Sequence, residues 1–539
     1  MPPRVAFRAS RQQPVGVVIV GCGAGGGVLA KELSEAGLTV LVLEAGRRFI
    51  AGVDYRTAER EFEVTAPTVF APEPSRDRHT CHGTAFEVSR VKGVGGSTLA
   101  YLAVVPRFHP SDFRVRSEDG IADDWPLTYE ELESYYSEVE YELGVSGPDG
   151  EDASPFEPVR TAPYPTPPHE FNKASLAIKR GADRLGWHLR REPLAIPTKP
   201  WHGRPACLRA GACMFGCAAE AKSSIDVTYV PKAEATGRVE IRPRCVAREV
   251  TVGDDGRARS VVYLDAKGQE HEVFGRVVVL AASAIETPRL LVMSRSRRFP
   301  AGLANGSGLV GRYFMEHLAV VAFGVFDERL DAWRGTPAGG SIQDFYETDR
   351  PNAFARGFTI EVNCSRQWPL AVARRLGVWG ASHRARMKDV FGRMVGLATV
   401  GEQLPDVRNT VELDPVVKDS FGLPVPRITC EARDNDRAML RVIPRRLTEL
   451  LEAAGAREIW EPAYMPGWSA HYLGTCRMGR DPRTSVVDAW CRAHEVPNLY
   501  VGDGSVFVTG AAANPALTIM ALAMRTAEGI VRAFRDGHA

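Results

Sequence analysis

Hydrophobic residues near the N-terminus follow the order strand, turn, helix, strand. The apolar run VGVVIV at 15–20 predicts a buried strand, and GCGAGG at 21–26 predicts a glycine-rich turn. Helical spacing then continues to Gly37, and LTVLVL at 38–43 predicts a second strand that ends at Glu44. One βαβ unit therefore opens the chain.

A second set of regular segments lies far along the chain. Residues 239–280 contain several alternating stretches, which predict strands with turns at Asp254-Asp255-Gly256 and Lys267-Gly268. Residues 498–508 predict a short strand with a Gly-Asp-Gly turn, and a long helical pattern follows from Pro515 to about Arg532.

The middle of the chain has a different pattern. Residues 147–200 are rich in Pro, and after Glu316 the regular apolar periodicity gives way to irregular segments with scattered aromatic residues. No repeat of fixed period is present. The whole pattern predicts an α/β protein in which a nucleotide-binding domain, discontinuous in sequence, is interrupted by a second domain.

Composition narrows the class of protein. With 539 residues the chain is long enough for two or more compact units, and 67 Lys+Arg against 66 Asp+Glu give no reason to expect a nucleic-acid partner. The longest apolar run, at 277–285, is well short of the roughly 18 residues of a membrane helix. No secretion signal is evident in the first residues, so a cytoplasmic protein without a membrane span is expected.

The glycine-rich turn has the spacing of a dinucleotide site. Gly21, Gly23 and Gly26 form G-x-G-x-x-G between a strand and a helix, where absent side chains permit a tight turn and close approach of a pyrophosphate. The helix N-terminus favours this anion, and Glu44 is placed to accept hydrogen bonds from a ribose diol. The motif alone does not choose between FAD and NAD.

Further segments together resemble the glucose-methanol-choline (GMC) oxidoreductase family. They are VKGVGGSTLAY at 91–101, DDWPLTYEELESYYSEVEYELGVSG at 123–147, GLVGRYFMEH at 308–317, and HYLGTCRMG at 471–479 with VGDGSVFVTGAAANPALTIMALA at 501–523. The resemblance implies an FAD-dependent enzyme with a Rossmann-like FAD-binding domain and an inserted substrate-binding domain that contains an antiparallel sheet. The expected boundaries are 1–115, 205–315 and 466–539 for the FAD-binding domain, and 116–204 and 316–465 for the substrate-binding domain.

The same resemblance implies further cofactor contacts. Gly95, Gly96 and Ser97 would run beside the flavin, Asp503 would lie near the pyrophosphate and ribityl chain, and Val246 would cover the adenine. Tyr101 stands where the wider family often has Asn, which resembles the sugar-dehydrogenase branch. Because no clear His for a covalent link is found around Gly95, FAD is expected to bind non-covalently.

Two residues of the C-terminal block are the candidate reacting groups. His471 can take the hydroxyl proton of an alcohol while hydride leaves the carbon for flavin N5, and Asn514 can bond the same oxygen through its amide. His317 is expected to be structural. Asn514 and Pro515 also match the N-cap and first residue of a helix, whose positive end would face the flavin and favour the anionic reduced ring.

Three cysteines form a cluster with the spacing Cys207-x5-Cys213-x3-Cys217. Family members that pass electrons to a membrane cytochrome resemble this spacing and carry an iron-sulfur cluster there, whereas other members have a similar segment with structural cysteines. With no fourth Cys nearby and no linked cytochrome, structural free thiols are the favoured interpretation.

The sequence therefore predicts an alcohol dehydrogenase or oxidase that acts on a sugar-like alcohol, such as a glycoside, cyclitol or amino sugar. Oxygen or another redox carrier would restore the flavin. Alternatives within the family are a sterol or aliphatic alcohol oxidase, or a lyase without net redox chemistry. A non-catalytic electron-transfer subunit and an NAD-dependent dehydrogenase are the other hypotheses, but neither explains why His471 and Asn514 both lie in matching motifs.

Overall fold

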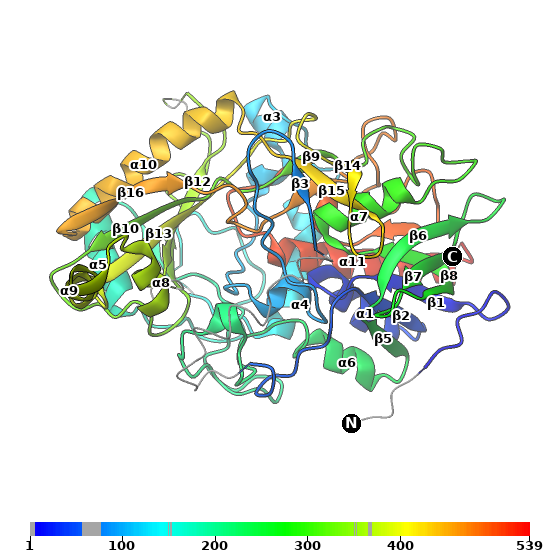
Figure 1. Ribbon diagram of the computed structural model, residues 1–539, viewed down its shortest axis with the longest axis horizontal. Helices are drawn as coiled ribbons and strands as arrows, with labels where there is room; N and C mark the ends of the chain where they lie inside the picture. Colours follow the sequence, from blue (N-terminus) through cyan, green and yellow to red (C-terminus); the bar gives the residue numbers. More distant parts are fainter. Residues whose placement is uncertain are drawn as a thin grey trace.

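The computed structural model describes residues 6–55, 77–148, 150, 153–349, 351, 353–364 and 369–538. Two large sheets dominate it, each with its own helices (Figure 1). No helix of these described ranges is both long and apolar enough to cross a lipid bilayer.

The first large sheet carries the predicted βαβ unit. Its strand order is β5-β2-β1-β8-β7-β6, with β18 beside β8. Neighbours are parallel from β5 to β8 and between β8 and β18, whereas β6, β7 and the first half of β8 form an antiparallel meander. The strands are β1 (Val15–Val20), β2 (Val40–Glu44), β5 (Val239–Pro243), β6 (Val246–Val252), β7 (Ala258–Leu264), β8 (Glu270–Leu280) and β18 (Leu499–Val501).

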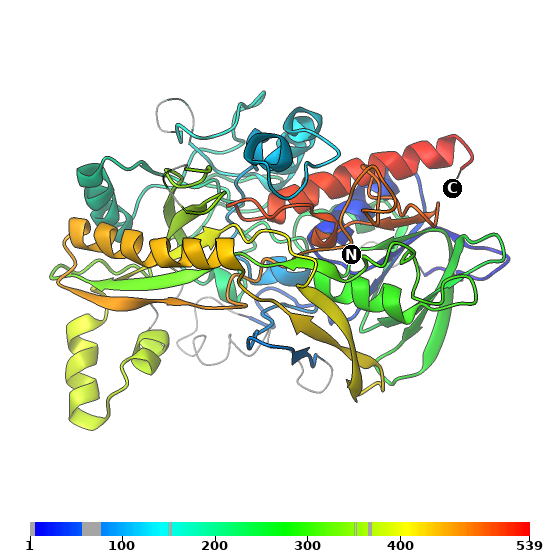
Figure 2. The same ribbon diagram turned by 90° about the horizontal axis from the view of Figure 1, so that it is seen from above.

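Helices of distant sequence pack against this parallel sheet. α1 (Ala24–Glu35) lies between α11 (Ala516–Arg535) and α6 (Tyr229–Ala235), so the first and last helices of the chain are neighbours. Figure 2 shows the red α11 crossing above the blue N-terminal segments. α4 (Tyr129–Leu143) packs on α11, and α7 (Ser283–Met293) follows β8. The predicted N-terminal unit, the strands of 239–280 and the C-terminal helix are confirmed.

The second large sheet is antiparallel, which confirms the sheet that the family resemblance implied, although the irregular pattern after Glu316 did not reveal its strands. Its order is β16-β10-β13-β12-β11-β4. The three central strands are buried along almost their whole length, so they lack the alternation that marks a strand with one wet face. The strands are β4 (Leu189–Arg190), β10 (Val320–Val325), β11 (Ala338–Ile342), β12 (Phe358–Asn363), β13 (Met394–Gly401) and β16 (Glu458–Tyr464).

Helices lie on both sides of this second sheet. α10 (Asp434–Ala454) runs along one face together with α5 (Lys173–Leu185). α8 (Pro369–Arg375) and α9 (Gly380–Val390) project from the opposite side (Figure 2). The 21 residues of α10 are a further regular element that the sequence pattern did not reveal.

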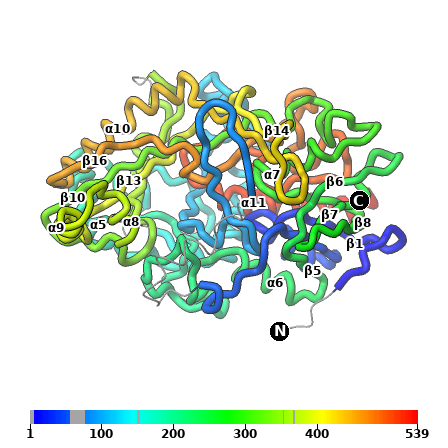
Figure 3. The backbone as a smooth tube through the Cα atoms, viewed as in Figure 1, coloured from blue at the N-terminus to red at the C-terminus, as the bar shows by residue number. Residues whose placement is uncertain are grey.

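A small third sheet brings the candidate reacting segments together. β9 (Arg312–Met315) pairs antiparallel with β17 (Leu473–Thr475), so Glu316 and His317 after β9 come beside His471 before β17. β14 (Thr410–Lys418), β15 (Pro424–Thr429) and β3 (Thr80–Cys81) complete the sheet. Figure 3 shows the blue segment around β3 passing in front, between the two large sheets.

Candidate active site

The glycine-rich turn is packed tightly against backbone on three sides. Gly21 has a φ of +99°, and a Cβ at Gly26 would lie 2.0 Å from the Gly21 carbonyl oxygen. A Cβ at Gly25 would lie 1.7 Å from the carbonyl oxygen of Gly502. Side chains are therefore excluded at these positions by the fold itself, without reference to any ligand.

The face of the turn over Gly23 is open instead. Among the described residues outside the adjacent chain and α1 itself, the only atom within 4 Å of a Cβ built there is the Cα of Gly96, at 3.8 Å. α1 begins at this point without a capping side chain and without an acidic residue in its first turn. Free N–H groups beside open space form an anion site, so these residues fit the pyrophosphate of FAD.

The predicted Gly95-Gly96 segment lies directly against this turn. The N–H of Gly95 donates to the carbonyl of Cys22 at 2.8 Å, and a Cβ at Gly96 would lie 2.6 Å from the Cα of Gly23. Ser97 follows as an exposed residue whose Oγ accepts from the N–H of Val91 at 3.2 Å. Two motifs about 70 residues apart thus form one cradle.

Glu44 lies at the edge of the same cradle. Its Oε2 accepts from the N–H of Cys22 at 2.9 Å and its Oε1 from the N–H of Gly46 at 2.8 Å, and burial raises the pKa of this carboxyl. The N–H of Cys245 donates to the carbonyl of Glu44, which places Val246, the first residue of β6, beside it. Glu44 and Val246 are therefore near each other, as a ribose and adenine site requires.

Asp503 connects elements around the cradle. Its Oδ2 accepts from the N–H of Ser283 at 3.0 Å and from the hydroxyl of Thr287 at 2.6 Å, and its Oδ1 accepts from the N–H of Ser505. The neighbouring Gly502 carbonyl lies against Gly25. The carboxylate thus fixes the start of α7 to the segment that approaches α1.

His471 is held by a loop that a buried carboxyl organises. Glu316 accepts from the N–H of Gly467 at 2.8 Å and from both the N–H and the hydroxyl of Ser469, at 3.0 and 2.5 Å. Burial raises the pKa of Glu316 to about 7, although these donors act in the opposite direction. The loop that precedes His471 is therefore anchored at three points by one side chain.

His471 is also hydrogen-bonded to a second histidine, His317. Their Nδ1 atoms are 2.8 Å apart, and Nε2 of His317 lies 3.0 Å from the carbonyl oxygen of Gly510. Burial lowers the pKa of His317 to about 4, so its ring is neutral near pH 7. Burial, with the charge of His317 as a smaller cause, lowers the pKa of His471 well below its usual range.

These contacts fix the protons on both rings. A carbonyl only accepts, so His317 carries its proton on Nε2 and its Nδ1 is a lone pair. His471 must then donate from Nδ1, which leaves its Nε2 unprotonated. Nε2 of His471 therefore has a lone pair that can accept a proton, while His317 contacts the ring through Nδ1.

Asn514 ends a segment that starts at the same histidine pair. The carbonyl of Gly510 accepts from His317, the carbonyl of Ala512 accepts from Thr359 of β12 at 2.7 Å, and the Asn514 amide hydrogen-bonds the carboxyl of Glu361. The expected N-cap role of Asn514 was wrong. Pro515 occupies the cap position of α11, where its ring offers no side-chain cap bond, and the Asn514 amide interacts with the carboxyl of Glu361.

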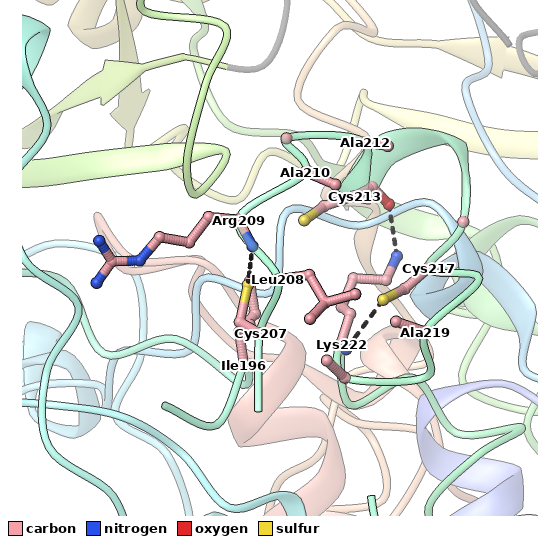
Figure 4. Close-up of a pocket in the computed structure, with 13 residues that line it drawn as sticks. Ile196, Cys207, Leu208, Arg209, Ala210, Ala212, Cys213, Cys217, Ala219 and Lys222 are labelled. Atoms are coloured by element: carbon pink, nitrogen blue, oxygen red, sulfur yellow. Dashed lines mark hydrogen bonds between the residues drawn. The ribbon is translucent and has the colours of Figure 1, made fainter. Parts of the chain in front are cut away.

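The three clustered cysteines lie apart from this pair, in a pocket of their own (Figure 4). Cys207 Sγ accepts from the N–H of Arg209, and Cys217 Sγ accepts from the N–H of Lys222. The ammonium of Lys222 donates to the Cys213 carbonyl at 2.7 Å. Within the described ranges no group of three or more His, Cys, Asp or Glu residues is arranged to hold a metal ion.

Sequence reasoning missed several residues of the site. His317 and Glu316 lie within a motif that had been identified, yet only the pairing of β9 with β17 brings them to His471. Glu361 lies in the middle segment where no motif was found. A carboxylate flanked by apolar residues, as in TIEVN at 359–363, is the signal that would have marked it.

A glycine cradle on a parallel sheet, next to a histidine and amide at the junction with an antiparallel sheet, is the arrangement of a dinucleotide-dependent oxidoreductase. Sequence models of the GMC oxidoreductases match residues 24–319 and 405–523. The chain belongs to the GMC oxidoreductase family and is an enzyme of that class. Members of this family bind FAD.

Individual relatives align with nearly the whole chain. The 2-methyl-1,2-propanediol dehydrogenase of Mycolicibacterium austroafricanum is 36% identical, with 96% of each chain covered. The 6'''-hydroxyparomomycin C oxidase of Streptomyces lividus is 31% identical, over 95% of this chain and 91% of its own. The crystal structure of pyridoxine 4-oxidase from Mesorbium loti has a TM-score of 0.66 at 19% identity, covering 96% of this chain and 99% of that one, and so shows a shared fold.

Proposed function

We propose that this enzyme oxidises the carbinol carbon of a sugar-like alcohol to a carbonyl, with His471 as the base and Asn514 as the orienting amide. The observation that carries the proposal is the hydrogen bond between His317 and His471, which leaves Nε2 of His471 with a lone pair. A base with a lowered pKa is unprotonated at neutral pH, as removal of a hydroxyl proton requires.

In the proposed reaction the substrate gives the proton of its O–H group to one acceptor and the hydride of its C–H group to another. Nε2 of His471 takes the hydroxyl proton, while the Asn514 amide N–H donates to the same oxygen and orients the carbon. FAD supplies the acceptor for the hydride that leaves the carbon. His317 keeps the proton of His471 on Nδ1, so the nitrogen that takes the substrate proton is always the same one.

Ten residues are proposed to hold FAD. They are Gly21, Gly23, Gly26, Glu44, Gly95, Gly96, Ser97, Val246, Asp503 and Pro515. Attachment is proposed to be non-covalent, because residues 91–101 contain neither His nor Cys. Acid precipitation of the holoenzyme is expected to release all of the yellow colour into the supernatant. Colour retained in the pellet would contradict this part of the proposal.

The residues that line the pocket beside Asn514 support a sugar-like substrate. The pocket there is lined by polar side chains as well as apolar ones, including Ser154, Ser341, Gln343 and Thr359. One relative is named for a small diol and another for an aminoglycoside, so both point to polyhydroxylated alcohols. Oxygen or another redox carrier would take the electrons afterwards.

The decisive experiment is anaerobic titration of the purified yellow enzyme with sugars, cyclitols, amino sugars, sterols and aliphatic alcohols. Bleaching of the flavin bands by the polyhydroxylated class alone is the expected result. Bleaching by sterols or simple alcohols only would overturn the substrate class. A flavin that stays oxidised with every alcohol, while substrate is consumed, would favour the lyase hypothesis.

A further inference from the structure

Two buried carboxyl groups share the pocket that reaches Asn514. Glu192 and Glu361 both line it, and they are only 6% and 5% exposed. Glu361 is on β12 and Glu192 follows β4, with β11 between these two strands. Ser341 of β11 is the register partner of Glu361 on β12 and of Arg190 on β4. Glu192 follows Arg190 by two residues, so the second sheet places Ser341 and both carboxyls in one region of the wall.

Each carboxyl has one oxygen engaged and one without a partner. Glu192 accepts from the hydroxyl of Ser341 and the N–H of Gly340, whereas Glu361 accepts from the amide of Asn514. Among the described residues, no hydrogen-bond donor reaches Oε2 of Glu192 or Oε1 of Glu361. Buried polar atoms are nearly always hydrogen-bonded, so two such oxygens in one pocket call for a ligand.

No cation in the ranges that the structure describes pairs with either carboxyl. Arg107 of the same pocket is bonded to Glu133 and Glu140, and Arg191 is bonded to Glu170. Arg190 also lines the wall, but it is not among the groups that shift the pKa of either carboxyl. Burial and mutual repulsion raise the pKa of Glu192 well above its usual range, and burial raises that of Glu361 to about 7.

We propose that Glu192 and Glu361 form a subsite for a protonated amine of the substrate, so that the alcohol oxidised is an amino alcohol such as an aminated sugar. This inference rests on the proposed function, because Asn514 links the subsite to the carbinol oxygen. An ammonium brings several donors and one positive charge, which match two open acceptors and would favour ionisation of the carboxyls in spite of their raised pKa values. A neutral hydroxyl brings no charge and would leave the pair protonated.

The test compares three methyl glycosides that differ in one group: a 2-amino-2-deoxyglucoside, the glucoside and the glucuronide. With the FAD-loaded enzyme, the amine is expected to raise the melting temperature and to reduce the flavin at a KM at least about 30-fold below that of the glucoside. The Glu192→Gln variant is expected to lose both advantages, so that its KM for the amine comes within about threefold of its own KM for the glucoside.

Glu157→Gln is the matched control. Glu157 lines the same pocket, but its carboxyl is already bonded to Tyr164 and Arg160, so this variant is expected to keep the preference for the amine. Glu361→Gln is the second variant if Glu192→Gln does not fold, and it is expected to lose the thermal shift in the same way.

The outcomes separate the subsite from the proposed function. A thermal shift by the amine that disappears in Glu192→Gln supports the subsite even if no glycoside bleaches the flavin, a result that would instead contradict the proposed function. Equal shifts with the amine and the glucoside, or a larger shift with the glucuronide, would overturn the subsite.

Discussion

The two sides of the enzyme bury carboxyl groups in opposite ways. On the cofactor side, both oxygens of Glu44 and of Asp503 accept hydrogen bonds from backbone N–H groups or a hydroxyl of the protein. On the proposed substrate side, no donor in the described part of the chain reaches one oxygen of Glu192 and one oxygen of Glu361. The first pair is hydrogen-bonded within the protein, whereas the second pair has the two oxygens to which the amine is proposed to bind.

This difference separates residues that build the fold from residues that serve a reaction. The cofactor cradle is made of backbone, and its glycines are required by contacts between chain segments. The substrate side depends on ionisable side chains that are costly to bury, and such groups concentrate at functional sites. Substitutions on the cofactor side should therefore reduce FAD binding, whereas substitutions on the substrate side should reduce kcat.

The largest effect is expected from His471→Ala. Without the base, kcat should fall by about 10³-fold to 10⁴-fold, because general base catalysis contributes on this scale. Flavin content should be unchanged, since no cradle contact involves the imidazole. The measurement is anaerobic flavin reduction in a stopped-flow instrument. His271→Ala is the control, because that histidine is exposed on β8 and pairs with Asp265 at 3.1 Å. A fall in kcat of less than tenfold in His471→Ala would contradict the proposed mechanism.

A second effect concerns pH and Glu316. The folded pKa of about 7 lies above the ordinary value of 4.5, so the stability linked to this carboxyl is fully present below pH 4.5 and is lost as the pH rises through 7. The free energy of unfolding of the wild type, relative to Glu316→Gln, should therefore fall by up to about 3 kcal/mol between pH 4.5 and 7.

Thermal unfolding of both proteins across this pH range measures the difference. A gap between the two melting temperatures that is constant with pH would show that Glu316 does not titrate there, and would contradict the anchoring of the His471 loop by a partly protonated carboxyl.

Paired substitutions at Gly23 and Gly25 test the backbone character of the cofactor side. In Gly23→Ala the new methyl group meets open space, so the chain should fold normally and bind FAD about 100-fold more weakly. In Gly25→Ala it would lie 1.7 Å from the Gly502 carbonyl oxygen, so the fold itself should be destabilised. Flavin content and the melting temperature of the apoprotein distinguish the two. Loss of folding in Gly23→Ala would contradict an open face.

The sequence predicted the structure best where the pattern involves residues close together in the chain. The turn at Gly21 to Gly26 and the strands around it were predicted from glycine spacing and apolar runs, which are set by neighbours in the chain, whereas the segment at Gly95 came from the family resemblance. On the substrate side, His471 and Asn514 were named in advance, but the contact of His317 with His471 was not, since it depends on a pairing of strands about 150 residues apart. Buried strands such as β12 and β13 also lack the alternation that would have revealed them.

The smallest effect, and the finest test of the substrate side, comes from His317. His317→Leu removes the acceptor for the Nδ1 proton of His471 and should lower kcat by roughly 10-fold to 30-fold, the cost of one buried hydrogen bond. His317→Gln retains an acceptor oxygen for His471 and a donor for the Gly510 carbonyl, so kcat should fall less than about threefold.

The pH profile adds a result that a purely structural role would not give. Since the charge of His317 helps to lower the pKa of His471, its removal should move the acid limb of kcat/KM to higher pH in both variants. If His317→Gln and His317→Leu reduce kcat equally and the acid limb of the kcat/KM profile does not move, His317 does not fix the proton on Nδ1 of His471. The base on the substrate side would then owe its tautomer to groups outside the histidine pair.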